Sequence, residues 1–403
     1  MKGHPHQSRS LGHGANETSR SGEGLTLRPN ADGWVVVTHT ILPNGAAHRL
    51  ATALRGRGLK VAFCALPMPG AKRWRAEAVI EGTGFVTSIA DLPHQVPRSR
   101  IVTNVASTVH FARRLRRLGI ERPVLVGCDP VSYLQAVAAM RFAGIHPIAE
   151  IVWFVDWSAQ RLESHLEGAA YRTAVRMAAR RADAVCAIST AAARYIQEVA
   201  PTRRRLEPIR VLPNLPLAFT NGPPWELRAP QVVYMGGLRP EHGVDVLVAV
   251  ARILLGGTKT SGVDVLGDGP LSGLVAQAAD RLPGLRFHGV VERIDVLEQI
   301  LHGARVGLAL YDPAFPQFSS GDSLKTKDYL AAGLAVVTTS ETGPRGGQVL
   351  VAPYDPKRVA DTVQEALSGP APALAAHPLL REGVAALDSL IAEVDRLTAR
   401  GGA

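Results

Sequence analysis

The chain repeats one pattern over most of its length, and this pattern constrains the fold more than any other feature. From Gly33 onward, short and nearly continuous apolar runs such as "WVVVTHT", "KVAFCAL" and "PVLVGCD" are each followed by a stretch of helix length. Strands that are apolar on both faces are typical of parallel sheets covered by helices on both sides. The sequence therefore predicts an α/β fold with doubly wound parallel sheets.

A proline-rich stretch interrupts the pattern once. The segment "LPLAFTNGPPWELRAP", residues 215–230, breaks the alternation, which restarts with "QVVYMGG". Clustered prolines of this kind are typical of linkers. We therefore expect two Rossmann-like domains, residues 33–214 and residues 231–369, that face each other across a cleft. Ligands of such sheets bind at the carboxyl ends of the strands, so the function should lie in this cleft.

The two ends of the chain do not share the pattern. Residues 1–32 are rich in Gly, Ser, His and Arg and contain few apolar residues, so they cannot repay the entropy lost on ordering. We expect a disordered N-terminal tail there. We expect residues 370–403 to form a C-terminal tail with a helix that packs back on the first domain. The sequence contains neither a long apolar run nor an apolar signal core, which favours a cytoplasmic protein.

Positive charge is concentrated in the first half of the chain. Residues 1–215 contain 29 Lys and Arg against 15 Asp and Glu, whereas the remainder contains 16 against 20. This asymmetry suggests an anionic partner for the first half. Nucleic acid is disfavoured, because aromatic residues make up only 5% of the chain and do not alternate with the basic ones.

The densest basic cluster ends an expected helix in "RRLRRLG". Its members are Arg113, Arg114, Arg116 and Arg117. One interpretation is a solvated helix end, where cations suit the negative end of the helix dipole. The alternative is a peripheral contact with the anionic inner face of a membrane.

The three cysteines are Cys64, Cys128 and Cys186. Their odd number and wide spacing argue against a disulfide framework or a metal cluster. We expect small buried side chains on strands, and no metal site.

Four loops of the second domain follow strands and should open on the same edge of its sheet. They are "MGGLRPEHG", "GDGP", "HGVVER" and the start of "SSGDSLKTKDYLAAGLAVVTTS". The glycines Gly236, Gly237, Gly267 and Gly269 permit tight turns and a close approach of the backbone to a ligand.

The order and spacing of these loops resemble a known family. "GGLRPEHGVDVLV", "LGDGPL", "LRFHGVV" and "SLKTKDYLAAGLAVVTT" are similar to the nucleotide-binding half of GT-B glycosyltransferases of the family 4 type, the group 1 glycosyl transferases. The resemblance implies the GT-B fold and the transfer of a sugar from a nucleoside diphosphate sugar, by default a UDP-sugar, to an acceptor hydroxyl. It implies a metal-independent, hexosyltransferase-like enzyme of carbohydrate biosynthesis that needs no cofactor. Two alternatives stay open: a nucleotide-sugar epimerase of the same fold, and a degenerate relative that binds a nucleotide sugar without transferring it.

The start of the helix in "SLKTKDYLAAG" is the centre of the expected donor site. With Asp322 or Ser323 as N-cap, the first-turn amides of Ser323, Leu324 and Lys325 can point at a diphosphate, and Lys325 adds a full positive charge. By resemblance, Asp328 occupies the second position of the family's Glu-X7-Glu motif and binds the ribose hydroxyls, while Ser320 stands at the first. Lys327 is expected on the exposed face of the helix.

The remaining donor contacts come from other loops. The family's usual Arg and Lys of the first loop are replaced here by Gly237 and His242, and Arg239 lies near enough to act instead. Gly45, in "LPNGAAH", resembles the glycine-rich loop that approaches the donor from the first domain. The expected donor-binding set is Gly45, Gly236, Arg239, His242, Val290, Ser323, Leu324, Lys325 and Asp328.

The reacting group on the acceptor side is expected from the first domain. Asp156 ends the buried run "VWFVD" between two Trp residues, where it could serve as the general base for an acceptor hydroxyl or as the cap of the next helix. His39, after the first strand, is the weaker candidate. Asp156 and Lys325 are therefore the expected catalytic residues.

Overall fold

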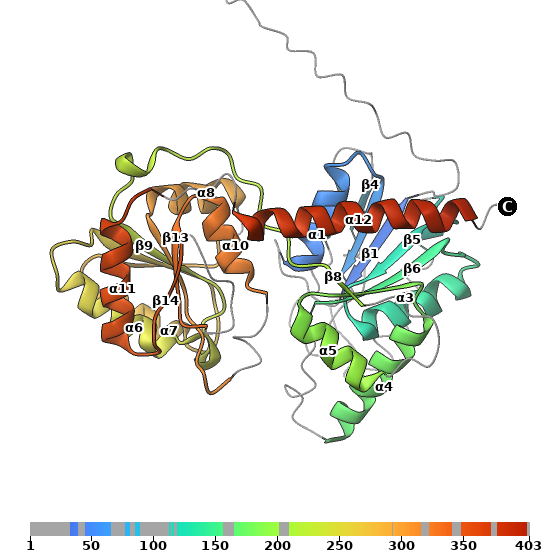
Figure 1. The fold of residues 1–403 in the computed structure, drawn as a ribbon, viewed down its shortest axis with the longest axis horizontal. Coiled ribbons are helices and arrows are strands. Elements are labelled where there is room, and N and C mark those ends of the chain that lie inside the picture. Colours follow the sequence, from blue (N-terminus) through green and yellow to red (C-terminus); the bar gives the residue numbers. More distant parts are fainter. Residues whose placement is uncertain are drawn as a thin grey trace, which may run out of the picture.

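The computed structural model describes most of the chain. The described residues are 33–38, 45–65, 77–80, 85–88, 113, 115–116, 119–155, 165–200, 209–291, 293–315, 322–340, 348–371 and 377–400. They form two α/β bodies joined by a linker and crossed by one long C-terminal helix (Figure 1). The predicted tail at residues 1–32 lies outside the described residues.

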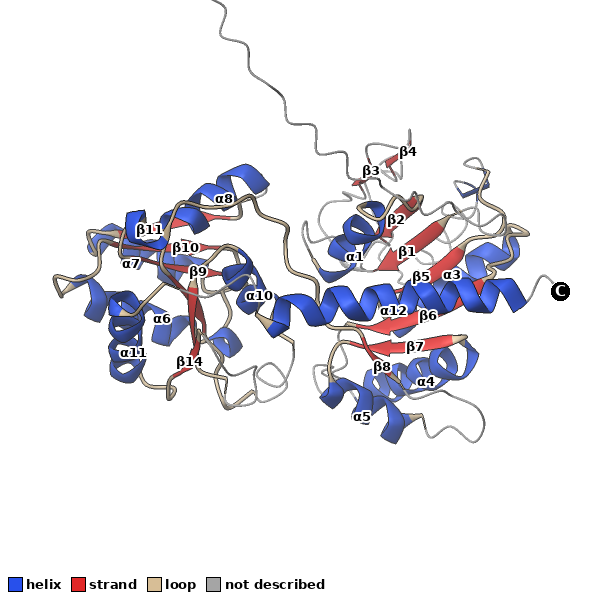
Figure 2. Cartoon of the chain, turned by 45° about the horizontal axis from the view of Figure 1, so that its top comes forward, coloured by secondary structure: helices blue, strands red, loops and turns tan. Residues whose placement is uncertain are grey.

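The first body contains a parallel sheet with the strand order β2-β1-β5-β6-β7-β8 (Figure 2). Its strands are β1 (Trp34–Thr38), β2 (Val61–Ala65), β5 (Val124–Gly127), β6 (Ala149–Phe154), β7 (Ala184–Ala187) and β8 (Arg210–Val211). A short antiparallel pair, β3 (Glu77–Ile80) and β4 (Phe85–Ser88), lies next to β2. Alternate residues of β1 enter two separate cores, because Val35 packs on one face of the sheet and Trp34 on the other.

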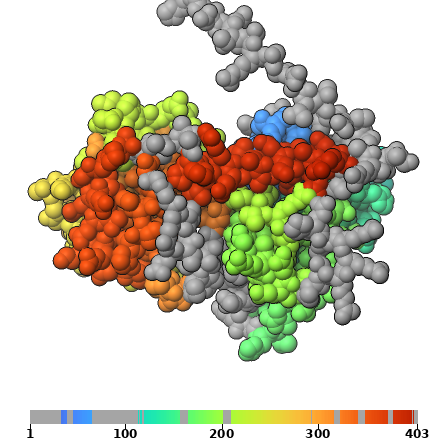
Figure 3. Space-filling view, viewed as in Figure 1, coloured from blue at the N-terminus to red at the C-terminus, as the bar shows by residue number. Residues whose placement is uncertain are grey.

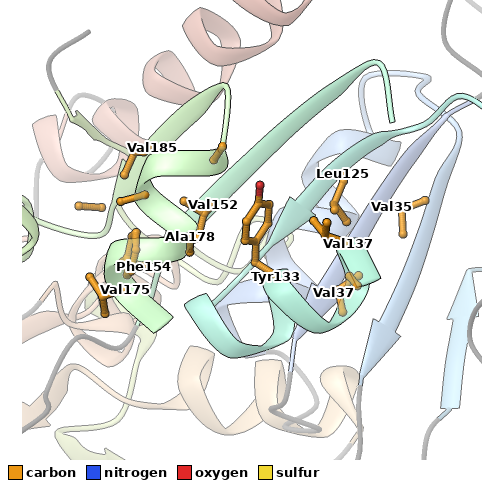
Figure 4. Packing of buried hydrophobic residues seen from close by; sticks show 14 of the residues in the cluster. Val35, Val37, Leu125, Tyr133, Val137, Val152, Phe154, Val175, Ala178 and Val185 are labelled. Atoms are coloured by element: carbon orange, nitrogen blue, oxygen red, sulfur yellow. The ribbon is translucent and has the colours of Figure 1, made fainter. Parts of the chain in front are cut away.

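The helices of the first body cover both of these faces. They are α1 (Ala46–Arg55), α3 (Pro130–Phe142), α4 (His165–Arg181) and α5 (Thr190–Val199). The sequence sets their starts locally: Asp129 caps α3 by accepting from the Ser132 amide, and Ser189 caps α5. On the α3 side, Tyr133 is fully buried between residues of β1, β5 and β6 (Figure 4), and its hydroxyl donates to Glu150 at 2.6 Å.

The second body contains a parallel sheet with the order β11-β10-β9-β12-β13-β14. Its strands are β9 (Gln231–Met235), β10 (Gly262–Leu266), β11 (Leu285–Gly289), β12 (Val306–Ala309), β13 (Ala335–Thr338) and β14 (Val349–Val351). Its helices are α6 (Val244–Leu255), α7 (Ser272–Arg281), α8 (Ile294–Gly303), α10 (Leu324–Ala331) and α11 (Pro356–Ser368). Two doubly wound parallel sheets confirm the predicted α/β fold.

The C-terminal helix α12 (Pro378–Arg400) lies along the first body although it follows the second in sequence (Figures 1 and 3). The buried residues Leu387, Leu390 and Val394 belong to the core that also contains α1 and the face of β1 that carries Trp34. Two ion pairs add to this contact: Arg57 Nε lies 2.6 Å from Asp388 Oδ1, and Arg210 pairs with Glu393. The last helix therefore belongs to the first body by packing.

Several smaller expectations can be compared with the structure. Cys64, Cys128 and Cys186 are buried and free, Cys64 and Cys186 on strands and Cys128 directly after β5. Arg113 and Arg116 are exposed in a helical segment, whereas Arg114 and Arg117 lie outside the described residues. A search of the described helices finds none whose length and apolar character would let it span a bilayer.

Both sheets change strand order next to their first strand, and this position locates the candidate site. In the second sheet the switch lies between β9 and β12, which pair in parallel with β9 at the centre. Loops that leave a switch point in opposite directions leave a crevice between them. Helix α10, which follows β12, lies on the side of the second body that faces the first (Figure 1).

Candidate functional site

Two glycine-containing loops of the candidate site, one after β9 and one after β10, pack against each other. A Cβ on Gly267 would come within 1.9 Å of the Gly236 carbonyl oxygen, and one on Gly269 within 2.4 Å of the Leu238 carbonyl oxygen. The Leu238 amide donates to the Asp268 carbonyl at 2.9 Å, which joins the two loops directly. In this structure the close approach that Gly267 and Gly269 permit is therefore to a neighbouring loop of the same chain.

This packing predicts the effect of one substitution. Gly267 has φ +134°, so Gly267→Ala would combine a strained backbone with a collision against the Gly236 carbonyl. We expect the free energy of unfolding to fall by about 2–4 kcal/mol in urea denaturation. Gly273→Ala is the matched control, because Gly273 is exposed in α7 with nothing within 4 Å of its Cβ position, and it should be neutral or stabilising. Equal stability of the two variants would contradict the loop packing.

Lys325 lies against the first of these loops and is the central feature of the site. Its Nζ is 4.8 Å from the ring centroids of both Tyr234 and Tyr311, and a Cβ on Gly236 would lie 3.4 Å from it. The residue is only 9% exposed, and Nζ has no hydrogen-bond partner among the residues that the structure describes. Aromatic faces compensate an ammonium group only in part, so within the described part of the chain this buried amine has no anion beside it.

Burial has a strong effect on the protonation of this group. The pKa of Lys325 is lowered to about 7, because desolvation disfavours its charged form. Burial also raises the pKa of Tyr311 to about 12 and raises that of Tyr234 above its usual range, so both neighbouring phenols stay neutral. An anion placed beside Lys325 would favour the ammonium form and supply the missing hydrogen-bond partner.

The helix that carries Lys325 begins at the site. Ser323 is its N-cap and accepts from the Thr326 amide at 3.2 Å. The Tyr311 hydroxyl donates to Ser323 Oγ at 2.7 Å, which ties the cap to the end of β12. The first amides of a helix lack partners within it and favour an anion, so the start of α10 and Lys325 point to the same ligand chemistry.

Lys327 contradicts the expectation of an exposed position. It is 1% exposed, and its Nζ donates to Asp322 at 2.6 Å and to the Asn214 carbonyl at 2.8 Å. Asp322 also accepts from the Asn214 amide at 2.6 Å. The expectation is wrong because residue 214, at the entrance to the linker, passes over this face of α10 and excludes water from it.

Asp328 is fully buried and paired with a residue that the sequence did not single out. Arg49 of α1 holds its carboxylate from two sides, with Nη1–Oδ1 at 2.5 Å and Nη2–Oδ2 at 2.8 Å. The Leu217 amide donates to the same Oδ1 at 3.0 Å. The expected ribose contact of Asp328 stays a prediction, and it requires this carboxylate to release Arg49.

The other expected donor residues lie on the loops that follow β9 and β11. His242 Nδ1 donates to the Gly237 carbonyl at 2.9 Å, and its ring meets that of Tyr311 edge-on. Arg239 is 58% exposed in its side chain, with Glu241 at 3.8 Å. Val290, after β11, is 59% exposed. None of the three is among the buried residues of the second domain.

The first body contributes to the site from the other side. Gly45 is the residue directly before α1, and the partly buried Leu324 of α10 packs against the first-body core that contains α1. Asp156, His39 and Ser320 lie outside the described residues, so their expected roles stay predictions. Within the described part of the chain, no group of three or more His, Cys, Asp or Glu side chains could hold a metal ion.

Comparisons with known proteins agree with this geometry. Residues 229–369 match the family described as "Glycosyl transferases group 1". The structure of an α,α-trehalose-phosphate synthase (UDP-forming) from Burkholderia vietnamiensis has a TM-score of 0.60 at 15% identity, covering 93% of this chain and 99% of that one. The corresponding enzyme from Burkholderia multivorans has a TM-score of 0.58 at 14% identity, covering 92% and 99%.

Other comparisons are more distant. The chain spans 57% of the length of S. aureus TarM, with 72% of this chain covered, 12% identity and a TM-score of 0.49. No curated protein sequence matches. At such identities the solved structures show the fold, and the family match covers the second body alone. The chain thus has the GT-B fold, and residues 229–369 of its second body match the group 1 glycosyl transferases.

Proposed function

We propose that this chain is a glycosyltransferase that moves a sugar from a nucleoside diphosphate sugar to an acceptor hydroxyl. The observation that carries the proposal is Lys325: a buried amine with no hydrogen-bond partner among the described residues, at the switch point of a domain that matches the group 1 glycosyl transferases. Sugar transfer breaks the bond between the anomeric carbon and a diphosphate oxygen, so negative charge grows on the diphosphate. A cation and helix amides held in place before the reaction stabilise that charge.

The donor site can operate without a metal ion. Lys325 and the first amides of α10 would neutralise the leaving diphosphate, and Arg239 and His242 lie on the adjacent loop. We propose a hexosyl donor with UDP as the nucleotide, because the trehalose-phosphate synthase from Burkholderia vietnamiensis, which has the same fold, carries the description "UDP-forming". Gly236 and Val290 would approach the diphosphate and the base, and Gly45 the sugar.

The acceptor would bind on the first-domain side of the cleft. We propose Asp156, after the end of β6, as the group that takes the proton of the acceptor hydroxyl. A base in this position serves an inverting enzyme. In a retaining enzyme the departing diphosphate can take the proton, and Asp156 would then orient the acceptor.

The function is tested by incubating the purified protein with a panel of nucleotide sugars, with and without cell extract as acceptor. Transfer predicts nucleotide release that depends on the acceptor. Isomerised donor without an acceptor would indicate a nucleotide-sugar epimerase instead. Donor binding without turnover under either condition would indicate a relative that binds the nucleotide sugar only.

We also propose that the basic cluster at Arg113 and Arg116, with Arg114 and Arg117 beside them in the sequence, contacts anionic lipid. Each cation near such a surface contributes about 1 kcal/mol. The protein should sediment with vesicles containing phosphatidylserine at low salt and be released at high salt, because salt screens this attraction. Arg113→Gln/Arg116→Gln should weaken sedimentation by about 10-fold or more. Binding that does not depend on salt or on these residues would instead support the interpretation of the cluster as a solvated helix end.

A further inference from the structure

The two domains are joined by a buried ion pair between Arg49 and Asp328. These residues are 279 positions apart in the chain, yet they form two charge-assisted hydrogen bonds, with exposures of 6% and 0%. Arg49 belongs to α1 of the first domain and Asp328 to α10 of the second. A planar guanidinium that meets a carboxylate with two parallel bonds fixes direction as well as distance.

The linker contacts both residues of this ion pair. Arg49 Nη1 also donates to the Leu215 carbonyl at 3.1 Å, and Asp328 Oδ1 accepts from the Leu217 amide. Directly before the linker, the Asn214 amide donates to Asp322 and the Asn214 carbonyl accepts from Lys327. Helix α10 is therefore held along one side by the first domain and by the segment that connects the domains.

Lys325 lies one helical turn before Asp328 on the same short helix. Because an eight-residue helix moves as one piece, the contact that holds Asp328 also sets where the Lys325 amine lies. The helix is anchored to its own domain as well, since the Met235 amide donates to the Tyr329 hydroxyl at 2.6 Å. Helix α10 thus contacts both domains, and it carries Lys325.

A buried ion pair is weak evidence for stability alone, because the cost of desolvating two charges can exceed their attraction. Its geometry instead selects one arrangement of the segments that it joins. We propose that Arg49 is a positioning residue. Through Asp328 it fixes the position of α10 and the angle between the domains, and it thereby places Lys325 where its amine can bind the donor diphosphate. This inference rests on the proposed function, in which Lys325 binds that diphosphate.

The test compares two diphosphate probes, of which only one carries a nucleoside. Isothermal titration with UDP and with inorganic diphosphate is carried out on the wild type, Arg49→Lys and Arg57→Lys. Arg49→Lys keeps the charge but loses the two parallel bonds, and we expect 5- to 20-fold weaker binding of both probes. Arg57→Lys is the matched control, because Arg57 pairs with Asp388 of α12 away from the site, and it should bind both probes as the wild type does.

A second variant keeps the inference testable if Arg49→Lys does not fold. Arg49→Met/Asp328→Leu removes both charges and retains apolar volume, so it should fold with a thermal midpoint near that of the wild type and still bind diphosphate 5- to 20-fold more weakly. Unchanged diphosphate affinity in a folded variant would overturn the inference. A loss confined to UDP would also overturn it, because Asp328 would then act on the ribose. A wild type that binds neither probe would instead reject the proposed donor site.

Discussion

Lys325→Met is expected to weaken donor binding and turnover strongly while making the free protein more stable. Loss of a charged hydrogen-bond donor should weaken nucleoside diphosphate binding by about 10- to 100-fold. The loss in kcat/KM should reach about 10²- to 10³-fold, because the diphosphate charge grows in the transition state. The unfolding free energy should rise by about 1–3 kcal/mol, since methionine fills the same space without a buried polar atom that lacks a partner.

The gain in stability has a defined pH dependence. The pKa of Lys325 is about 7 in the folded protein against an ordinary value of 10.5, so the wild type becomes more stable as pH rises from 7 toward 10.5. The advantage of Lys325→Met should therefore be largest at or below pH 7 and shrink above it. Thermal unfolding at pH 6.5 and pH 9 measures both effects.

The matched control is Lys357→Met, which removes an exposed lysine of α11. It should change neither binding nor stability by more than about 0.5 kcal/mol. A Lys325→Met protein that is less stable than the wild type, or that binds nucleoside diphosphate normally, would show that the buried amine has a partner in solution and does not await the donor.

Donor binding is expected to take up a proton. With a pKa of about 7 in the free protein, Lys325 is mostly neutral at pH 8.5, yet the diphosphate requires its ammonium form. Affinity should therefore be nearly constant below pH 7 and fall about 10-fold for each pH unit above it. The phenols of Tyr234 and Tyr311 do not titrate in this range, because burial raises both of their pKa values.

Isothermal titration calorimetry measures this proton uptake directly. Titration with UDP at pH 8.5, in two buffers that differ in ionisation enthalpy, should show an uptake of about one proton. The terminal phosphate of the nucleotide, with a pKa of about 6, stays ionised under these conditions. Lys325→Met should show no uptake. Wild-type affinity that is flat from pH 7 to pH 9 would rule out a neutral lysine in the free site.

The sequence by itself determined the architecture and the starts of the helices. Apolar runs of strand length separated by helix-length segments specify doubly wound sheets, because each strand must be covered on both faces. Ser323 could be named as a possible cap, because a serine side chain bonds to an amide only three residues away. Lys325 could be named as well, because a cation at a helix start after a strand has few structural uses.

Only the tertiary structure decided which polar groups of α10 face a ligand and which face the protein. The sequence predicts Lys327 on the solvent side of the helix and Asp328 at a ligand, yet the chain beside the linker and α1 bury both. One signal was available: Arg49 lies three residues after Ala46, on the apolar stripe of α1. That stripe shows that Arg49 is buried, but it does not name the partner. The partner depends on how two separately folded domains meet, and helical periodicity holds no information about a contact 279 residues away.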